Sequence, residues 1–331
     1  MNPSAKLSVC MIVRDEEATL DRALASVAGV ADEIVVVDTG SVDGTAAIAK
    51  RHGAKVVEAA WQDDFSRARN VYLEEATGDW VMGLDGDEWL DDSCRALVKD
   101  RIATATADGL QVVQRSFLPV TELITYEECP MTRVFRRRPE YRYEGAVHEQ
   151  IVPAILRAKG TIAESDLVIL HDGYAFDGEV AARRSARNLA ILERLVAADP
   201  ADSYLLFQLG VTRKAVGDVA GAEAALGSAL DGDDGRLGEY NVEQACLKLA
   251  QIALGKGDHK SAITFAEQCL ARNEHNALAL YVGGLALIDE GDFAGALRCF
   301  TRLRASPIVR DSHRADVESV TTFLRNKLKG R

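Results

Sequence analysis

The first half of the chain alternates short apolar runs with stretches of helical periodicity. Leu7 to Val13 is apolar apart from Ser8, as expected for a strand that is covered on both faces of a sheet. Helical spacing follows in four apolar residues, Leu20, Ala23, Leu24 and Val27. The same alternation predicts further strands at 33–38, 55–58 and 80–84, and helices at 45–52 and 65–76. This order of elements indicates crossover units on a parallel sheet.

The pattern becomes irregular between about residues 109 and 172. Strands are predicted at 109–115, 131–136 and 166–170, and we interpret them as an antiparallel extension of the sheet. After Tyr174 the apolar positions are mostly Ala, Leu and Gly at helical spacing. We therefore expect an α/β domain at 1–178 and an all-α domain at 179–331.

The second half contains a repeated motif. Gly-Asp dipeptides begin at 217, 257 and 291, and an alanine follows each of them four residues after the Asp. Each dipeptide is expected to lie in the turn between two helices. The last interval, 34 residues, is the tetratricopeptide period, and Gly284 and Ala296 are small residues of the kind that let paired helices pack closely. A helix at 187–198 would cap the array. Such repeats either present a concave surface to a partner or brace the neighbouring domain.

Composition narrows the function classes. The 331 residues carry a formal net charge of -12, which works against binding to nucleic acid or to an anionic membrane surface. The first residues lack the pattern of a signal peptide, and no apolar run reaches the length of a membrane span. We expect a cytoplasmic protein. The six cysteines include no CxxC pair, so neither a disulfide framework nor a zinc site is indicated.

Four stretches of sequence between about residues 7 and 90 occur in the order and spacing of a known family. They are SVCMIVRDEEATLDRALASV, DEIVVVDTGSVDGT, WQDDFSRARN and TGDWVMGLDGDEWL. Together they resemble the family 2 glycosyltransferases, and especially a bacterial branch in which this domain precedes tetratricopeptide repeats. The resemblance implies an α/β domain of the GT-A type, a nucleotide-diphospho-sugar transferase fold, followed by an all-α tetratricopeptide-like domain.

A sugar-nucleotide reaction develops negative charge on the departing diphosphate, so a divalent cation or fixed positive groups must lie beside it. Asp85 and Asp87 follow the strand at 80–84, and their carboxylates suit Mn²⁺ or Mg²⁺. They occupy the place of the family's DxD motif. The resemblance implies that Asp87 contacts the metal and that Asp85 holds the ribose, or the metal through water. The alternative is a solvated turn, because turns favour Asp and Gly.

Three further residues are candidates for binding the donor. Asp38 ends the second strand, and the resemblance assigns that position to the nucleotide base; the alternative is a turn or capping residue. Asp15 follows the first strand, at a position where this branch more often has Asn. Arg69 lies on the helix that begins after Asp64, where Arg67 or Asn70 could serve instead, and a solvated helix face is an equal alternative.

Candidates for the chemistry of transfer come from later in the chain and from the DxD strand. His171 follows the apolar run LVIL and matches the branch's H-x-G-Y text with Gly173 and Tyr174, which implies a metal ligand. The alternative is a histidine that only satisfies hydrogen bonds. An inverting transfer needs a general base to deprotonate the acceptor. Glu149 is the first candidate for this base and Glu88 the second, although Glu149 could simply begin a helix.

The sequence therefore predicts a metal-dependent glycosyltransferase that moves a sugar, with inversion, from a nucleotide donor to a protein, peptide or glycan bound by the repeats. The rival is an adaptor in which the repeats recruit a partner and the α/β domain only binds nucleotide. A nucleotidyltransferase of the same fold is weaker, because the Gly-rich basic loop after the first strand is missing. The signatures of P-loop, Rossmann, GxSxG and HExxH enzymes are also missing.

Overall fold

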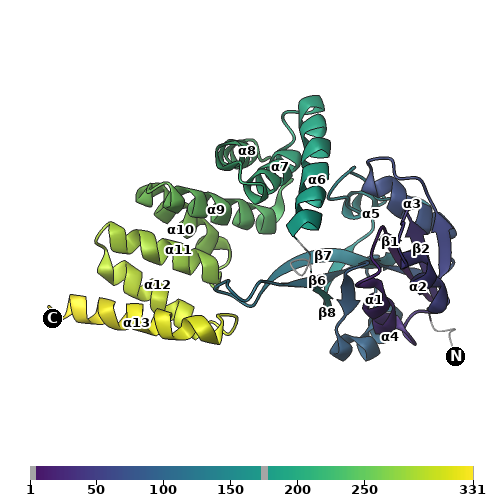
Figure 1. Cartoon of the computed structure of the whole chain (residues 1–331), viewed down its shortest axis with the longest axis horizontal. Coiled ribbons are helices and arrows are strands. Elements are labelled where there is room, and N and C mark those ends of the chain that lie inside the picture. The colour runs from purple at the N-terminus through teal and green to yellow at the C-terminus, as the bar shows by residue number, and fades with distance from the viewer. Residues whose placement is uncertain (1–4, 173–177, 331) are drawn as a thin grey trace. The chain divides into compact units, whose positions relative to one another are not determined.

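The computed structural model describes residues 5–172 and 178–330, with side chains from residue 182 onward in the second range (Figure 1). Its internal contacts divide the chain into two compact units. Unit 1 comprises Met1–Phe117 and Glu127–Ala175, and unit 2 comprises Leu118–Tyr126 and Phe176–Arg331. The chain thus passes between the units three times. The domain boundary at 178/179 stays a prediction, and residues 173–177 beside it lie outside the described part.

Unit 1 is a sheet with helices on both faces. Among the described residues, eight strands form one sheet in the order β3-β2-β1-β4-β7-β6-β8-β5. The strands are β1 Leu7–Val13, β2 Glu33–Asp38, β3 Lys55–Glu58, β4 Trp80–Asp85, β5 Glu88–Leu90, β6 Gly109–Phe117, β7 Tyr126–Arg136 and β8 Ile162–His171. The helices are α1 Leu20–Val27, α2 Thr45–Arg51, α3 Phe65–Glu75, α4 Arg95–Thr104 and α5 Val152–Arg157.

The strands β1 to β4 confirm the predicted parallel arrangement. β1 pairs in parallel with β2 on one side and with β4 on the other, and β2 pairs in parallel with β3. Alternate residues of β1 enter different cores: Met11 packs in the cluster that includes α1 and α4, whereas Cys10 packs in the cluster that includes α3. Both side chains are fully buried. This two-sided burial explains why β1 has almost no polar position.

The second half of the sheet only partly follows the predicted antiparallel extension. β7 is antiparallel to β4 and β5 is antiparallel to β8, but β6 and β8 are parallel. The prediction was wrong for this last pair because strand direction depends on long connections rather than on local pattern. The three-residue strand β5 was missed, since it is too short to show a period.

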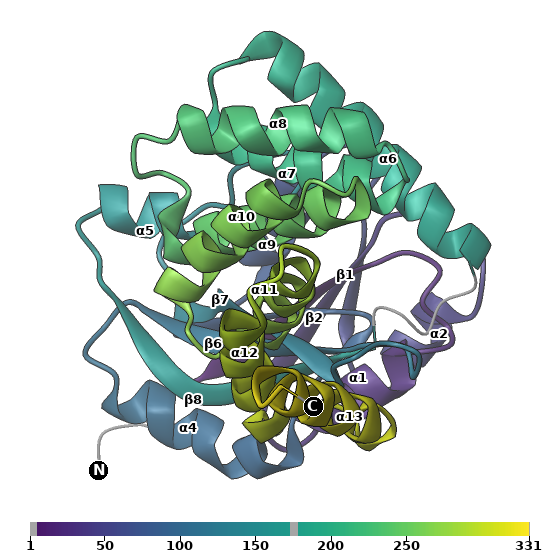
Figure 2. The ribbon, with the colours of Figure 1, turned by 90° about the vertical axis from the view of Figure 1, so that its left-hand side faces the viewer.

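Unit 2 is a series of antiparallel helix pairs. The helices are α6 Gly178–Ala198, α7 Ser203–Ala215, α8 Val219–Asp231, α9 Gly238–Gly255, α10 His259–Arg272, α11 Ala277–Asp289, α12 Phe293–Ala305 and α13 Asp311–Leu328. Figure 2 shows the pairs α7/α8, α9/α10 and α11/α12 following one another in chain order. This is the predicted tetratricopeptide-like array. No helix in the described ranges is long and apolar enough to cross a membrane.

The Gly-Asp turns explain why the repeats form. Each glycine has a positive φ, between 75° and 85°, which is the left-handed conformation that ends a helix. Each following aspartate caps the next helix by accepting a hydrogen bond from a backbone N–H: Asp218 from Gly221, Asp258 from Ser261 and Asp292 from Gly295. The dipeptide therefore ends one helix and begins the next.

Small residues bring the paired helices together as predicted. A Cβ atom on Gly284 of α11 would lie 2.7 Å from the Phe300 ring of α12, and one on Gly210 of α7 would lie 2.6 Å from Leu226 of α8. Phe300 and Leu226 are both buried. Because such a contact is far shorter than van der Waals distance, these positions require glycine.

The 118–126 segment, which comprises the β6–β7 connection and the first residue of β7, belongs to unit 2. Ile124 forms an isolated antiparallel bridge with Val309, in the loop between α12 and α13. Its side chain is 3% exposed and packs in the apolar cluster that contains Leu280 and Phe300. An apolar residue of the β6–β7 connection thus completes the core of the last repeat, which the sequence pattern did not predict.

Candidate functional site

The acidic candidates lie at the carboxyl ends of adjacent parallel strands. In the sheet register, Val13 of β1 is opposite Asp38 of β2, and Ile12 is opposite Asp85 of β4. Asp38 and Asp85 therefore flank the end of β1 on either side. Open α/β sheets bind their ligands in the crevice at this edge, because loops and helix termini open there.

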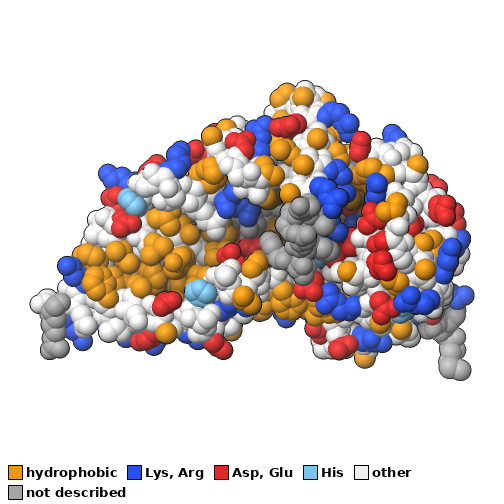
Figure 3. All heavy atoms as spheres, viewed as in Figure 1, with side chains coloured by type: hydrophobic (Ala, Val, Ile, Leu, Met, Phe, Trp, Pro, Cys, Tyr) orange, Lys and Arg blue, Asp and Glu red, His pale blue; other side chains and the backbone are white. Residues whose placement is uncertain are grey.

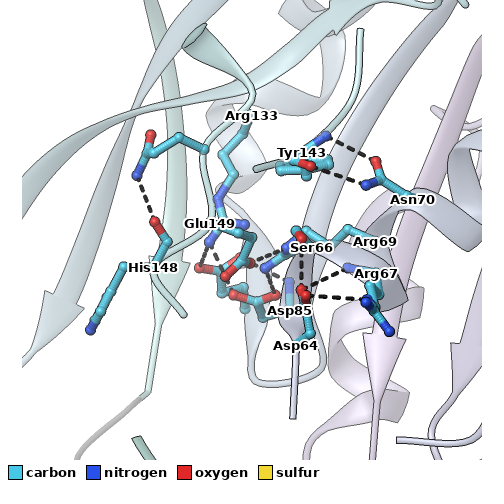
Figure 4. Close-up of polar contacts among 12 residues, drawn as sticks. Asp64, Ser66, Arg67, Arg69, Asn70, Asp85, Arg133, Tyr143, His148 and Glu149 are labelled. Carbon is cyan, nitrogen blue, oxygen red and sulfur yellow. Dashed lines mark hydrogen bonds and ion pairs between the residues drawn. The ribbon is translucent and has the colours of Figure 1, made fainter. Parts of the chain in front are cut away.

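Asp85 is held by two arginines. Arg69 of α3 donates from Nη2 to Asp85 Oδ1 at 2.6 Å, and Arg133 of β7 donates from Nη2 to Oδ2 at 3.0 Å (Figure 4). Both guanidinium groups are buried. Burial favours the neutral acid, but the two positive charges outweigh it, and the pKa of Asp85 lies well below its ordinary value. Asp85 is therefore a fixed carboxylate.

Glu88 lies next to Asp85 and Arg133 and has no exposed surface. It accepts hydrogen bonds from Arg133 Nη2 at 3.1 Å, from the backbone N–H of Asp85 at 2.9 Å, and from the side-chain amide of Gln114. Burial raises the pKa of Glu88, although Arg133 opposes this effect. A fully buried acid with all these partners is suited to holding Asp85 and Arg133 in place, and poorly placed to take a proton from an acceptor.

Glu149 lies on the other side of Arg69. Its Oε1 accepts a hydrogen bond from Arg69 Nε, and its side chain is 9% exposed. Arg69 thus joins Glu149 to Asp85, and its own Nη1 is buried without a hydrogen-bond partner. Figure 4 shows Glu149 directed toward the Asp85 cluster, whereas the neighbouring His148 points away from it. Among the two predicted bases, only Glu149 keeps some exposed surface.

Asp87 and His171 form the second part of the site. His171 Nε2 lies 3.7 Å from Asp87 Oδ2, and His171 Nδ1 lies 2.9 Å from the hydroxyl oxygen of Ser116 on β6. Burial disfavours the charged imidazolium, but the hydrogen bond and the negative charge of Asp87 outweigh it, and the pKa of His171 is raised. The resembling H-x-G-Y text cannot be followed further, because Gly173 and Tyr174 lie outside the described residues.

Few side chains near Asp87 could act as metal ligands. Within residues 5–172 and 178–330, no three His, Cys, Asp or Glu side chains are close enough together to hold a metal ion by themselves. Asp87 and His171 would supply two ligands. Mg²⁺ and Mn²⁺ in phosphate-transfer sites are commonly held by one or two protein side chains, with substrate phosphates and water completing the shell. The residues present fit such a cation.

Asp38 and Asp15, two of the candidates for binding the donor, stabilise the loop that follows β2. Asp38 Oδ1 accepts hydrogen bonds from the backbone N–H groups of Gly40 and Ser41, so this oxygen stabilises a turn. Asp15 has a φ of 55° and accepts from the backbone N–H of Val42 at 2.8 Å. Asn and Asp are the residues that best tolerate this left-handed conformation, which accounts for either residue occurring at this position.

The other polar residues of α3 have different tasks. The Asn70 amide exchanges two hydrogen bonds with the backbone of Tyr143, at 2.9 and 3.0 Å. Arg67 is 68% exposed and donates to Gln62. Arg69 is therefore the residue of this helix that the structure brings to the acids. Sequence reasoning missed Arg133, Gln114 and Ser116, because they come from β6 and β7 and no motif marks them.

Residues 8–157 match the family described as Glycosyl transferase family 2. They form a family 2 glycosyltransferase domain. A TPR repeat-containing protein of Synechococcus elongatus is 35% identical over 265 residues, which cover 78% of this chain and 64% of that protein. The lipopolysaccharide core biosynthesis glycosyltransferase LpsC of Rhizobium meliloti is 31% identical over 165 residues, which cover 46% of this chain and 59% of LpsC. The chain thus spans less than two thirds of these relatives.

Two solved structures are similar to this chain at lower identity. TarS 1-349 of S. aureus in complex with UDP-GlcNAc is 15% identical, with a TM-score of 0.45 over 86% of this chain and 92% of that chain. Glucosyl-3-phosphoglycerate synthase from Mycobacterium tuberculosis, in complex with Mn²⁺, UDP and phosphoglyceric acid, is 16% identical, with a TM-score of 0.42 over 58% of this chain and 78% of that chain.

Proposed function

We propose that this protein transfers a sugar from a nucleoside-diphosphate donor to a protein, peptide or glycan acceptor, with a divalent cation and with inversion. One observation carries the proposal: within a family 2 domain, Asp38 and Asp85 flank the end of β1, and Asp87, two residues after the end of β4, lies 3.7 Å from His171 at the end of β8. This arrangement would accommodate a nucleotide, a diphosphate and a cation at one sheet edge.

Charge at the site favours a cation over arginine for the diphosphate. Arg69 and Arg133 are each paired with protein carboxylates, so their positive charge is already balanced. Asp87 and His171 would hold Mn²⁺ or Mg²⁺, which would offset the charge that develops on the departing diphosphate. Asp85, fixed by both arginines, would accept from the ribose or from a water on the metal. Asp38 and Asp15 would border the base and ribose.

Glu149 would act as the general base. Inversion requires a general base that removes the proton from the acceptor nucleophile, which attacks the sugar from the side opposite to the departing diphosphate. Glu149 lies next to Arg69, which also binds Asp85, so the base and the donor carboxylate share one rigid support. This shared arginine would hold Glu149 at a constant distance from the bound sugar.

A panel of sugar nucleotides and nucleoside diphosphates tests the donor assignment. We expect one nucleotide to raise the melting temperature in the presence of Mn²⁺ and not with EDTA, because the cation joins Asp87 and His171 to the diphosphate. Slow hydrolysis of the matching sugar nucleotide should accompany binding. Binding without hydrolysis, under every metal condition, would favour the adaptor function; no binding at all would reject both.

We also propose that unit 2 selects the acceptor. Stacked helix pairs offer an extended surface suited to a peptide, a protein or a large glycan. Hydrophobic side chains gather on the face over α11 and α12 in Figure 3. Half-buried side chains that pack against the apolar cluster of these helices include Tyr281, Leu285 and Ile288 of α11, and Leu297 of α12. Bracing of the family 2 domain remains the alternative role of these helices.

Removal of unit 2 separates recruitment from bracing, provided that the 118–126 segment is treated with it. Truncation after residue 178 alone would expose Leu118, Leu123 and Ile124, which pack in the cluster of the last repeat. We therefore expect that variant to aggregate. The same truncation with 118–125 replaced by a Gly/Ser linker of equal length should stay folded and hydrolyse donor, yet lose transfer to the natural acceptor.

Circular dichroism and donor hydrolysis report on folding, and product analysis reports on transfer. The full-length protein with the same linker is the matched control. Aggregation of the linker-carrying truncated protein would favour bracing. Normal transfer by it would show that the repeats serve another partner.

A further inference from the structure

Arg310 of unit 2 makes several hydrogen bonds to the connection between β6 and β7. Arg310 Nη2 donates to the carbonyl oxygens of Leu118, Pro119 and Thr125, at 2.5, 3.1 and 3.4 Å. The backbone N–H of Arg310 also donates to the carbonyl of Leu123 at 3.0 Å. All of these atoms belong to unit 2. A guanidinium group is suited to this task, because its planar fork can serve several carbonyls at once.

The hydrogen bonds of Arg310 include the two ends of the connection, next to the end of β6 and the start of β7. The backbone N–H of Leu118 donates to the carbonyl of Thr125 at 3.0 Å, so these two residues close the loop. Arg310 binds both of their carbonyls. Thr125 is fixed further by its N–H and its hydroxyl, which donate to the carbonyl of Ile308 at 2.9 and 3.2 Å. The ends of β6 and β7 are thereby held together.

The end of β6 carries a residue of the site. Ser116 precedes Leu118 by two positions, and in the sheet register it is directly opposite His171 of β8. Its hydroxyl oxygen lies 2.9 Å from His171 Nδ1. For Nε2 to bind a cation, the proton must be on Nδ1 and must be donated to an acceptor, because a neutral imidazole has one donor and one acceptor nitrogen. The Ser116 hydroxyl oxygen is within reach to be that acceptor.

We propose that Arg310 is a positioning residue for the metal site. By fixing the end of β6, it holds Ser116 where the hydroxyl sets the orientation and tautomer of His171. Arg310 touches neither substrate nor metal, and it acts through the backbone of residues 116–118. The inference rests on the proposed function, since it assigns a cation to Asp87 and His171. It makes the last loop of the repeat array part of the machinery that prepares donor binding.

The test compares Arg310→Ala with Arg314→Ala. Arg314 lies near the same loop and donates to the carbonyls of Arg304, Ser306 and Pro307, at 3.4 to 3.5 Å. From α13, Arg314 therefore brings the same chemical group to the α12–α13 loop without hydrogen bonds to the 118–126 segment. A role confined to stability of the repeats should lower the melting temperature in both variants and leave Mn²⁺ binding unchanged.

We expect Arg310→Ala to raise the Kd for Mn²⁺ about tenfold in the presence of the nucleoside diphosphate, as is typical when a partner behind a ligand is lost. Arg314→Ala should keep the wild-type value. Ser116→Ala should raise the Kd for Mn²⁺ similarly. The double variant should have no higher Kd than either single variant, because both residues act on the cation through the same contact, that of Ser116 with His171. Hydrogen exchange of residues 113–118, measured without metal, should rise in Arg310→Ala only.

Arg310→Lys covers the case in which the alanine variant unfolds, and it should give a smaller rise in Kd of the same sign. Unchanged Mn²⁺ affinity and unchanged hydrogen exchange in the Arg310 variants would overturn the inference and leave the proposed function intact. Multiplying effects of Arg310→Ala and Ser116→Ala would also overturn it. A wild-type protein that binds no Mn²⁺ would instead overturn the metal site itself, and with it any role of Arg310 there.

Discussion

Replacing Asp87 with alanine should abolish metal-supported donor binding. Asp87 and His171 are the two side chains that would hold the cation, so the variant keeps a single protein ligand. Because loss of an outer-shell partner alone costs roughly 10–100-fold in metal affinity, we expect a loss of more than about 100-fold for a ligand. Calorimetric titration of the nucleoside diphosphate, with Mn²⁺ and with EDTA, measures the effect.

Asp100→Ala is the matched control for this change. The Asp100 side chain is 62% exposed and pairs with Arg101 on α4, so its removal takes away one carboxylate without touching the site. It should bind donor as the wild type does. His171→Ala should weaken the Mn²⁺ dependence in the same direction as Asp87→Ala. Unchanged affinity in Asp87→Ala would remove this residue from the site and leave the cation without its main ligand.

Replacing Glu149 with glutamine should lower turnover while donor binding is retained. The glutamine oxygen can still accept from Arg69 Nε, so Arg69 stays in position on Asp85. The amide cannot take a proton at neutral pH, and loss of a general base typically costs about 10²–10⁴ in rate. Hydrolysis of the donor found in the panel measures turnover, and calorimetry measures its binding. A base and a metal ligand act at different steps, which separates this result from that of Asp87→Ala.

Glu144→Gln serves as the control for Glu149→Gln. Glu144 is close in the chain and 41% exposed, and its partner Arg157 lies on α5. Its change should leave both turnover and binding near the wild-type values. Full turnover in Glu149→Gln would mean that another group is the base. A parallel loss of donor binding would assign Glu149 to the support of Arg69 and Asp85 rather than to proton transfer.

The local sequence pattern determined the strands and helices at the sheet edge where the sugar-nucleotide donor is proposed to bind. Strands covered on both faces must be apolar, and a carboxylate directly after such a strand must lie at the sheet edge, which is how Asp38 and Asp85 were located. The paired helices are equally local: the turn within each of the pairs α7/α8, α9/α10 and α11/α12 has a glycine in the left-handed conformation and a capping aspartate. Within each helix pair, the turn therefore follows from the chemistry of a few adjacent residues.

The residues that hold the site's acids and histidine in place could not be predicted from local pattern. Arg133 reaches Asp85 from a strand 48 residues further along the chain, and Ser116 reaches His171 across 55 residues. These distances in sequence are closed only by the pairing of β7 with β4 and of β6 with β8. No local period specifies which strands become neighbours, because pairing depends on the packing of the whole sheet.

The sequence by itself thus determined the strand-end acids, the repeat and the family of the N-terminal domain. Tertiary structure alone decided that Glu88 is buried beneath Asp85, that Arg69 joins Asp85 to Glu149, and that the 118–126 segment lies in unit 2. The physical reason is the same in each case. Ion pairs and core contacts form between groups that are close in space, and folding brings those groups together through strand pairing and helix packing that no single stretch of sequence encodes.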